Sequence, residues 1–415
     1  MRNMILKNVR PFVNGKFEEP TTMNLVDGKW VGEAVSDAKE FDAKGALAIP
    51  ALFGLGLDFK EPLRDDIYTF RDGVNAMHRG GFFGGLYESS ANAIDDSLKL
   101  TAVQQLASKS GMKFAFLGAF SMGYQCKDLS EMVELAESGA VGFGDGNQNC
   151  ARTRFLRLAM EYGSMTGKRF FFMPLDDSLR HHGLVHEGSY SDLLGMKAIP
   201  RVAETMEAFR ILEMARFLKV PVHFKQVSCG ETLRLIENAR KNGVDVTCDV
   251  DIYHLLIDDS CLLDLDSHCN VPMPFRAASD RDALWKGLES GVVDAISVNH
   301  DPVLRQDKEV NFEDAVPGAV SLEIALPAIW KPLCERLSPA RAVELLSTAP
   351  AKLAGVEPSS LKLCANADMV LLDPDASADV VSSMFAGQVR NSPLLGKKIP
   401  SKILGSYLGG LWTKV

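Results

Sequence analysis

Eight short apolar runs between residues 51 and 301 constrain the fold more than any other feature. Each is too short for a helix and is bounded by Gly, Pro or polar residues, which is typical of buried parallel strands. The runs are ALFGLGLD (51–58), GGFFGGLYES (80–89), KFAFLGAFS (113–121), AVGFGDG (140–146), RFFFMPLDD (169–177), PVHFKQVS (221–228), DVTCDVD (245–251) and AISVNHD (295–301). Segments of helical period lie between them, for example at 154–167, 200–219 and 230–243. Eight such units in series predict an α/β fold, a closed (β/α)8 barrel of the TIM type.

The two ends of the chain predict a second, smaller unit. The first 47 residues alternate apolar and polar positions around the hairpin dipeptides Asn14-Gly15 and Asp27-Gly28. Near the other end, ADMVLLDPD and SSMFAGQVRNSPLLGKKI have the same character. We therefore expect residues 1–48 and 352–415 to form one composite, sandwich-like β domain, with the barrel at 49–351.

Charge and cysteine usage limit the classes of partner and the compartment. The net charge is −9, and Lys and Arg are scattered, which argues against nucleic acid or a membrane surface as a partner. The eight cysteines form no Cys-x-x-Cys pair, so reduced, mostly buried thiols are expected. No apolar run reaches the ~20 residues of a membrane span or resembles a signal peptide. These features predict a cytoplasmic protein.

Long segments of the chain also follow the order and spacing of a known enzyme family. They include FDAKGALAIPALFGLGLDFKEP, HRGGFFGGLYESSANAIDD, GAVGFGDG, VHFKQVSCGETLRLIENARKNGVDVTCDVDIYHLL and DALWKGLESGVVDAISVNHDP. Over nearly its whole length the chain resembles the long type of dihydroorotase, within the amidohydrolase superfamily. The resemblance implies the barrel fold and, in ordinary members, hydrolysis and closure of the dihydroorotate ring by metal-activated water.

The resemblance also places the family's functional positions, and here they hold unusual residues. Those positions and one neighbour are Gly56, Asp58, Lys60, Ser89, Asp145, Pro174, Gln226, Asn299 and His300. The family's four histidine ligands fall on Gly, Asp, Pro and Gln, and its substrate-binding arginine falls on Lys60. Its metal-bridging acid falls on Asp145 or, less favourably, Gly146, and its general-base aspartate falls on Asn299.

These replacements predict that the inherited chemistry is lost. A catalytic zinc needs about three protein ligands, and Gly and Pro side chains offer none. Glutamine is a poor zinc ligand beside imidazole, and the amide of Asn299 cannot accept a proton from water as a general base must. We therefore expect no catalytic residue, no bound metal and no other cofactor at the former site.

Other interpretations of the same residues remain open. A group of acidic and histidine side chains near the strand ends has the chemistry of a hard-cation site, or of a polar network that fills the mouth. These residues are Asp58, Asp145, Asp249, Asp251, His223, His254 and His300. Lys60 is expected to pair with a nearby carboxylate, because an unpaired buried charge is costly. The segment HHGLVHEG (181–188) is expected to be a surface loop with His181, His182 and His186.

The function expected from the resemblance is structural. Some aspartate transcarbamoylases require a catalytically silent dihydroorotase homologue, so this chain is expected to be such a pseudoenzyme in pyrimidine biosynthesis. The alternative is an active cyclic amidohydrolase, similar to dihydroorotase, hydantoinase or allantoinase, with a rebuilt site. A third interpretation is a small-molecule sensor. A homodimer is a common default for proteins of this kind.

Overall fold

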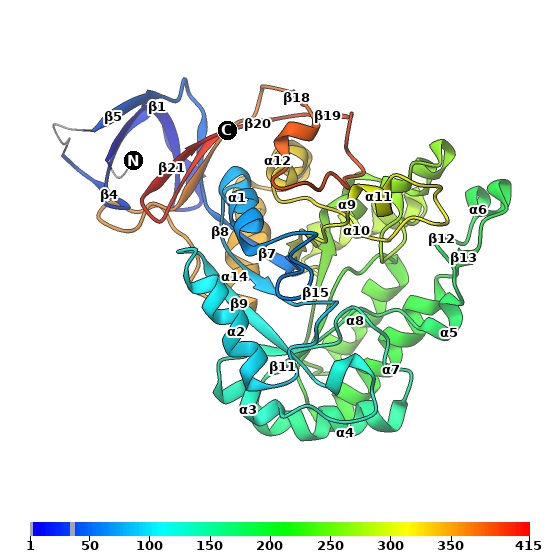
Figure 1. Ribbon diagram of the computed structural model, residues 1–415. Coiled ribbons are helices and arrows are strands. Elements are labelled where there is room, and N and C mark those ends of the chain that lie inside the picture. The colour runs from blue at the N-terminus through cyan, green and yellow to red at the C-terminus, as the bar shows by residue number, and fades with distance from the viewer. Residues whose placement is uncertain (1–2, 34–37) are drawn as a thin grey trace.

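A parallel barrel forms the larger part of the computed structural model, which describes residues 3–33 and 38–415 (Figure 1). Its strands are β7 (Leu52–Leu57), β8 (Phe82–Tyr87), β9 (Lys113–Ala119), β10 (Gly142–Gly144), β11 (Arg169–Phe172), β14 (Val222–Phe224), β15 (Val246–Asp251) and β16 (Ala295–Ser297). Consecutive strands pair in parallel from β7 to β16. A bridge between Leu57 and His300 joins the two ends of this sheet. Each predicted apolar run contains one of these strands, so the predicted barrel is confirmed.

Helices surround the barrel and present their apolar faces to it. The longer ones are α1 (Phe70–Gly80), α2 (Ser97–Ser108), α4 (Thr153–Gly163), α7 (Val202–Leu218), α8 (Gly230–Lys241), α10 (Ala278–Ser290) and α12 (Ala325–Arg336). In α8, for example, Leu233 and Ile236 are buried one turn apart, while the charged positions face outward. The three segments predicted to be helical correspond to α4, α7 and α8 within a few residues.

Strands from both ends of the chain share a nine-stranded sheet. Its main path is β21-β20-β17-β6-β1-β3-β4, and β2 and β5 also pair with β1. The strands are β1 (Met4–Val13), β2 (Lys16–Phe17), β3 (Thr21–Val26), β4 (Lys29–Val31), β5 (Lys39–Asp42), β6 (Leu47–Pro50), β17 (Met369–Asp373), β20 (Lys402–Leu408) and β21 (Leu411–Lys414). Both termini lie in this part of the molecule (Figure 1). The dipeptides Asn14-Gly15 and Asp27-Gly28 turn the predicted hairpins, with positive φ at all four residues.

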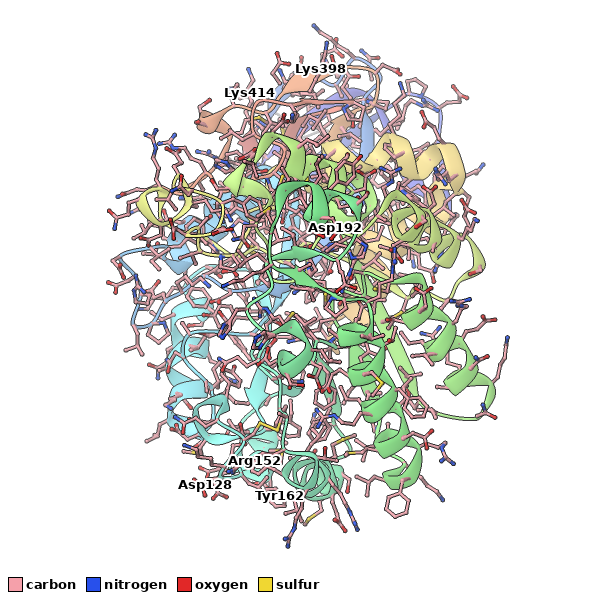
Figure 2. All side chains as sticks on the ribbon, turned by 90° about the vertical axis from the view of Figure 1, so that its right-hand side faces the viewer. Asp128, Arg152, Tyr162, Asp192, Lys398 and Lys414 are labelled. Atoms are coloured by element: carbon pink, nitrogen blue, oxygen red, sulfur yellow. A yellow bond between two sulfur atoms is a disulfide. The ribbon has the colours of Figure 1, made fainter. Side chains whose placement is uncertain are left out.

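The segment that follows β11 differs in part from the predicted surface loop. It contains α5 (Asp177–Arg180), β12 (Val185–His186), α6 (Ser189–Leu194) and β13 (Ala198–Ile199). His181 and His182 are exposed, as predicted. The prediction for His186 was wrong: it lies in a strand, is buried, and its Nδ1 is 3.3 Å from Nη1 of Arg276. Figure 2 views the molecule from this side, with Asp192 of α6 near the front.

One pair of cysteines departs from the expected reduced state. Cys126 and Cys150 form a disulfide with their Cα atoms 5.8 Å apart, and Figure 2 shows this bond above Arg152. The two residues follow β9 and β10, which are adjacent parallel strands, so their loops leave the barrel side by side. Sequence separation alone does not reveal this neighbourhood. No helix in the described residues has the length and apolarity needed to cross a bilayer.

Candidate functional site

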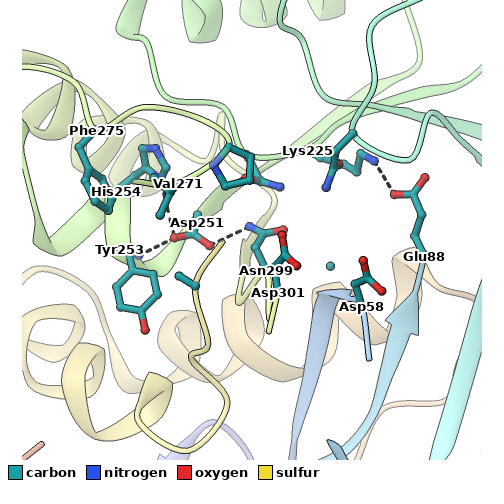
Figure 3. A pocket seen from close by; sticks show the side chains of 15 residues that line it. Asp58, Glu88, Lys225, Asp251, Tyr253, His254, Val271, Phe275, Asn299 and Asp301 are labelled. Carbon is teal, nitrogen blue, oxygen red and sulfur yellow. Dashed lines mark hydrogen bonds and ion pairs between the residues drawn. The ribbon is translucent and has the colours of Figure 1, made fainter. Parts of the chain in front are cut away.

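The carboxyl ends of the barrel strands surround a cavity of about 590 Å³ that is continuous with solvent. Four of the residues singled out from the sequence line it: Gly56, Asp58, Gln226 and Asn299. The other lining residues are Glu88, Asn147, Lys225, Asp251, Tyr253, His254, Val271, Pro272, Phe275, Asp301 and Ala319 (Figure 3). Ser89, Pro174 and His300 are buried next to the mouth but do not line this cavity.

Lys60 joins two carboxylates at one side of the mouth. Its Nζ lies 2.7 Å from Oδ2 of Asp58 and also forms an ion pair with Asp301. The backbone N–H and Oγ of Ser90 both donate to the same Asp58 oxygen. Burial alone raises the pKa of Asp58, but Lys60 and Ser90 outweigh it, and the net pKa is lowered. The predicted pairing of Lys60 with a nearby carboxylate is therefore confirmed, and Asp301 is a second partner.

Lys225 makes a similar arrangement across the mouth. Its Nζ lies 2.5 Å from Oε2 of Glu88 and 2.8 Å from Oδ1 of Asp145, and all three residues are at least 92% buried. Figure 3 shows the contact between Lys225 and Glu88. Backbone N–H groups complete the carboxylates: Gly146 donates to Glu88 at 2.8 Å and Met173 to Asp145 at 2.7 Å. Burial opposes the charge on Lys225, but its two carboxylate partners outweigh it and raise its pKa.

Asn299 occupies the space beside Gly56. Its Nδ2 donates to Oδ2 of Asp251 at 2.8 Å and to Oγ of Ser297 at 2.9 Å, which fixes the amide plane. A Cβ atom added to Gly56 would lie 2.1 Å from Oδ1 of Asn299. Gly56 also has φ of +76°, a conformation that favours glycine. The neutral amide and the missing side chain are therefore complementary in shape.

The remaining positions make structural contacts. Gln226 has φ of +55°, and its backbone N–H donates to Oδ1 of Asp249 at 2.9 Å. The other oxygen of Asp249 pairs with Nε2 of His223 at 2.9 Å. Ser89 accepts a hydrogen bond at Oγ from the backbone N–H of Asn92 at 3.1 Å, and Pro174 has no side-chain donor or acceptor.

The donor set does not fit a catalytic metal centre. No group of three or more His, Cys, Asp or Glu side chains suited to a metal ion occurs in residues 3–33 and 38–415. Asp58 and Asp145, the acids that sequence reasoning offered as cation ligands, each accept from an ammonium group instead. A divalent cation bound there would lie against those ammonium groups. The polar network, rather than the hard-cation site, describes the arrangement.

His300 is buried behind the mouth as a neutral imidazole. Its Nδ1 accepts the backbone N–H groups of Ser321 at 3.2 Å and Leu322 at 3.3 Å. Burial lowers the pKa of His300 to about 3, and the nearby Lys60 ammonium lowers it further than Asp58 raises it. The unfolded chain takes up a proton here near pH 6.5, whereas the folded chain does not until about pH 3.

Acidification is therefore expected to destabilise the protein through His300. Below pH 6.5 the unfolded state binds the extra proton, so the free energy of unfolding falls by up to about 1.4 kcal/mol per pH unit. Urea unfolding at pH 7.5, 6 and 5 measures this slope. The variant His300→Gln is expected to flatten it, with a residual slope from His186, whose pKa burial lowers to about 4. An unchanged slope in His300→Gln would assign the effect to other groups.

Sequence reasoning missed part of the network. Lys225, Glu88 and Asp301 all follow barrel strands, where they were noticed as polar residues, but the resemblance placed no function on them. The available signal was a lysine immediately before Gln226 and a glutamate immediately before Ser89, both at strand ends that converge in a barrel.

Comparisons with known proteins agree with the barrel and its β domain. No family model matches the sequence. The chain is 31% identical over 408 residues to a dihydroorotase of Pelotomaculum thermopropionicum, covering 96% of this chain and 95% of that protein. It is 32% identical over 368 residues to a dihydroorotase of Deinococcus radiodurans, covering 88% of each. Among solved structures, the L-hydantoinase (dihydropyrimidinase) from Arthrobacter aurescens superposes with a TM-score of 0.84 at 21% identity, over 100% of this chain and 96% of that one.

Proposed function

The chain belongs to the dihydroorotase family of the amidohydrolase superfamily, and from this premise we propose that it is a non-catalytic member that supports assembly of aspartate transcarbamoylase. The observation that carries the proposal is the pair of lysines in the mouth. Lys60 and Lys225 each neutralise two buried carboxylates, where a family enzyme would need free carboxylate and imidazole ligands. An amide stands at the position of the general base.

An exposed apolar surface also supports a role in assembly. Val202, Met206, Phe209 and Phe217 of α7 are each at least half exposed. Grouped apolar side chains on a protein surface are typical of protein contacts. The partner proposed here comes from the family resemblance, and its carbamoyl-transfer activity supplies a direct readout.

A second candidate is an active cyclic amidohydrolase, and the comparisons taken alone favour it. The named relatives are dihydroorotases, and the alignment with one of them runs over almost the whole of both chains. The mouth also keeps a solvent-connected cavity with polar side chains. This candidate requires hydrolysis by residues other than the family's ligand set, with Asp145 as the first residue to test.

One set of measurements on the purified full-length chain separates the candidates. For the non-catalytic role we expect less than about a tenth of an equivalent of zinc after supply of the metal, and no hydrolysis of dihydroorotate, hydantoin or allantoin. We also expect co-elution with aspartate transcarbamoylase and higher carbamoyl transfer in the mixture. Two independent peaks at micromolar concentration would contradict the assembly role. Hydrolysis that is abolished by Asp145→Ala would establish the second candidate.

A further inference from the structure

The cavity at the barrel mouth has two chemically different walls. Val271, Pro272, Phe275 and Ala319 form an apolar wall, and the opposite wall is dominated by carboxylates and amides (Figure 3). Its size, about 590 Å³, lies within the range of small-molecule sites. An occupant with one apolar and one polar end matches this division.

The charge of the polar wall is negative. The carboxylates of Asp58, Glu88, Asp251 and Asp301 line the cavity, and Asp145 lies behind them on Lys225. Against these five carboxylates stand the two ammonium groups of Lys60 and Lys225. The pKa values of Glu88 and Asp301 are raised, by burial first of all, yet with both protonated the balance is still one negative charge. Such a wall favours cations and repels the carboxylate of an anionic ligand.

Asp251 is the carboxylate of this wall that no ammonium group contacts in the described residues. Its Oδ2 accepts from the side-chain amide of Asn299 at 2.8 Å, and its Oδ1 accepts from the backbone N–H of Tyr253 at 2.7 Å (Figure 3). Both donors are neutral. The carboxylate therefore keeps its full charge and further acceptor capacity at the surface of the cavity.

His254 provides a second acceptor beside Asp251. Its Nε2 lies 3.1 Å from the carbonyl oxygen of Met273 and 3.3 Å from that of Pro274, so Nε2 carries the hydrogen and donates. In the neutral ring, Nδ1 is then an acceptor. It is buried without a hydrogen-bond partner in the described residues and lies 3.7 Å from Oδ1 of Asp251. Two acceptors this close call for a donor between or in front of them.

We propose that the barrel mouth binds a small organic cation with N–H donors, such as an amidinium, its donors directed at Asp251 and His254 and its apolar part against Val271 and Phe275. The inference rests on the proposed function in one respect, because it requires ammonium groups rather than metal ions in the mouth. It predicts selection against the anionic ring acids on which family enzymes act. The ligand class follows from the negative wall and from the two unpaired acceptors.

Three probes of nearly equal shape test the charge preference: benzamidine as the cation, benzamide as the neutral molecule and benzoate as the anion. Calorimetric titration and thermal shift of the full-length chain are expected to give benzamidine at least a tenfold lower dissociation constant than either of the others. Benzoate or benzamide binding as well as benzamidine would overturn the proposal. So would the absence of binding by all three up to about 10 mM.

A matched pair of variants tests the residue assignment. Asp251→Asn removes the charge but keeps an N-cap residue for α9 (Ile252–Leu256), so the fold is expected to persist. It is expected to weaken benzamidine binding at least tenfold. Asp192→Asn makes the same chemical change on the exposed α6 and is expected to leave binding unchanged. Equal binding by Asp251→Asn and the parent chain would overturn the proposed site.

Zinc content measured on the same samples keeps the two proposals distinguishable. A metal-free chain without preference for benzamidine would contradict the cation site alone. A chain that retains zinc and still prefers benzamidine would contradict the non-catalytic proposal and support the cation site.

Discussion

Replacing Lys225 by Met is expected to lower the free energy of unfolding by about 3–5 kcal/mol. Methionine keeps most of the aliphatic length but leaves Glu88 and Asp145 facing each other without a cation. Both carboxylates are buried, so their charges would be neither paired nor hydrated. Equilibrium unfolding in urea at pH 7.5, followed by fluorescence and circular dichroism, measures the change.

A matched control separates burial from the loss of an ion pair. Lys241 of α8 pairs with Glu237 at 2.7 Å, but the side chains are 65% and 45% exposed. Lys241→Met is therefore expected to cost less than about 1 kcal/mol. Adding Glu88→Gln and Asp145→Asn to Lys225→Met is expected to restore part of the stability, because the buried repulsion is removed. Equal costs for the two lysine variants would show that the mouth is more hydrated than the packing implies.

This result bears directly on the proposed function. If Lys225 stabilises the barrel by several kcal/mol, the carboxylates it neutralises are committed to holding the fold. An enzyme that used them for metal would have to give up that stabilisation whenever the site was loaded. A strongly stabilising Lys225 therefore favours a scaffold, whereas a dispensable Lys225 leaves the carboxylates available for chemistry.

The barrel could be predicted from the sequence because the pattern that encodes it is local. A buried strand of a parallel sheet is apolar on both faces, so every strand appears as a short apolar run. The pairing of Lys60 with Asp58 was also predictable, because the two residues are two positions apart at the end of β7. Local spacing is sufficient where the partners belong to one strand end.

The rest of the site was not predictable because it depends on contacts between distant strands. Lys225 meets Glu88 across 137 positions and Asp145 across 80. The family resemblance directed attention to the lost ligands, and it gave no indication of what replaced them. His186 was misplaced for a similar reason, since its burial depends on Arg276 from a different part of the chain.

The contact between Gly56 and Asn299 leads to the second prediction with a large expected effect. Gly56→Ala is expected to lower the free energy of unfolding by about 3–5 kcal/mol, from positive-φ strain together with overpacking. The new Cβ would lie 2.1 Å from Oδ1 of an amide that is fixed by Asp251 and Ser297. Gly195→Ala is the matched control, because Gly195 has φ of +65° with nothing within 4 Å of the added Cβ. It is expected to cost only the backbone strain, about 1–2 kcal/mol.

A double-mutant cycle with Asn299→Ala isolates the steric part of this effect. In the Asn299→Ala background, Gly56→Ala is expected to cost no more than Gly195→Ala, giving a favourable coupling of about 1–3 kcal/mol. The hydrogen bonds that Asn299 loses affect both sides of the cycle equally and cancel. A coupling near zero would mean that the amide moves aside freely. Strong coupling would mean that the family's histidine cannot return at position 56 until Asn299 is replaced, so the loss of the general-base carboxylate also blocks recovery of the metal ligand.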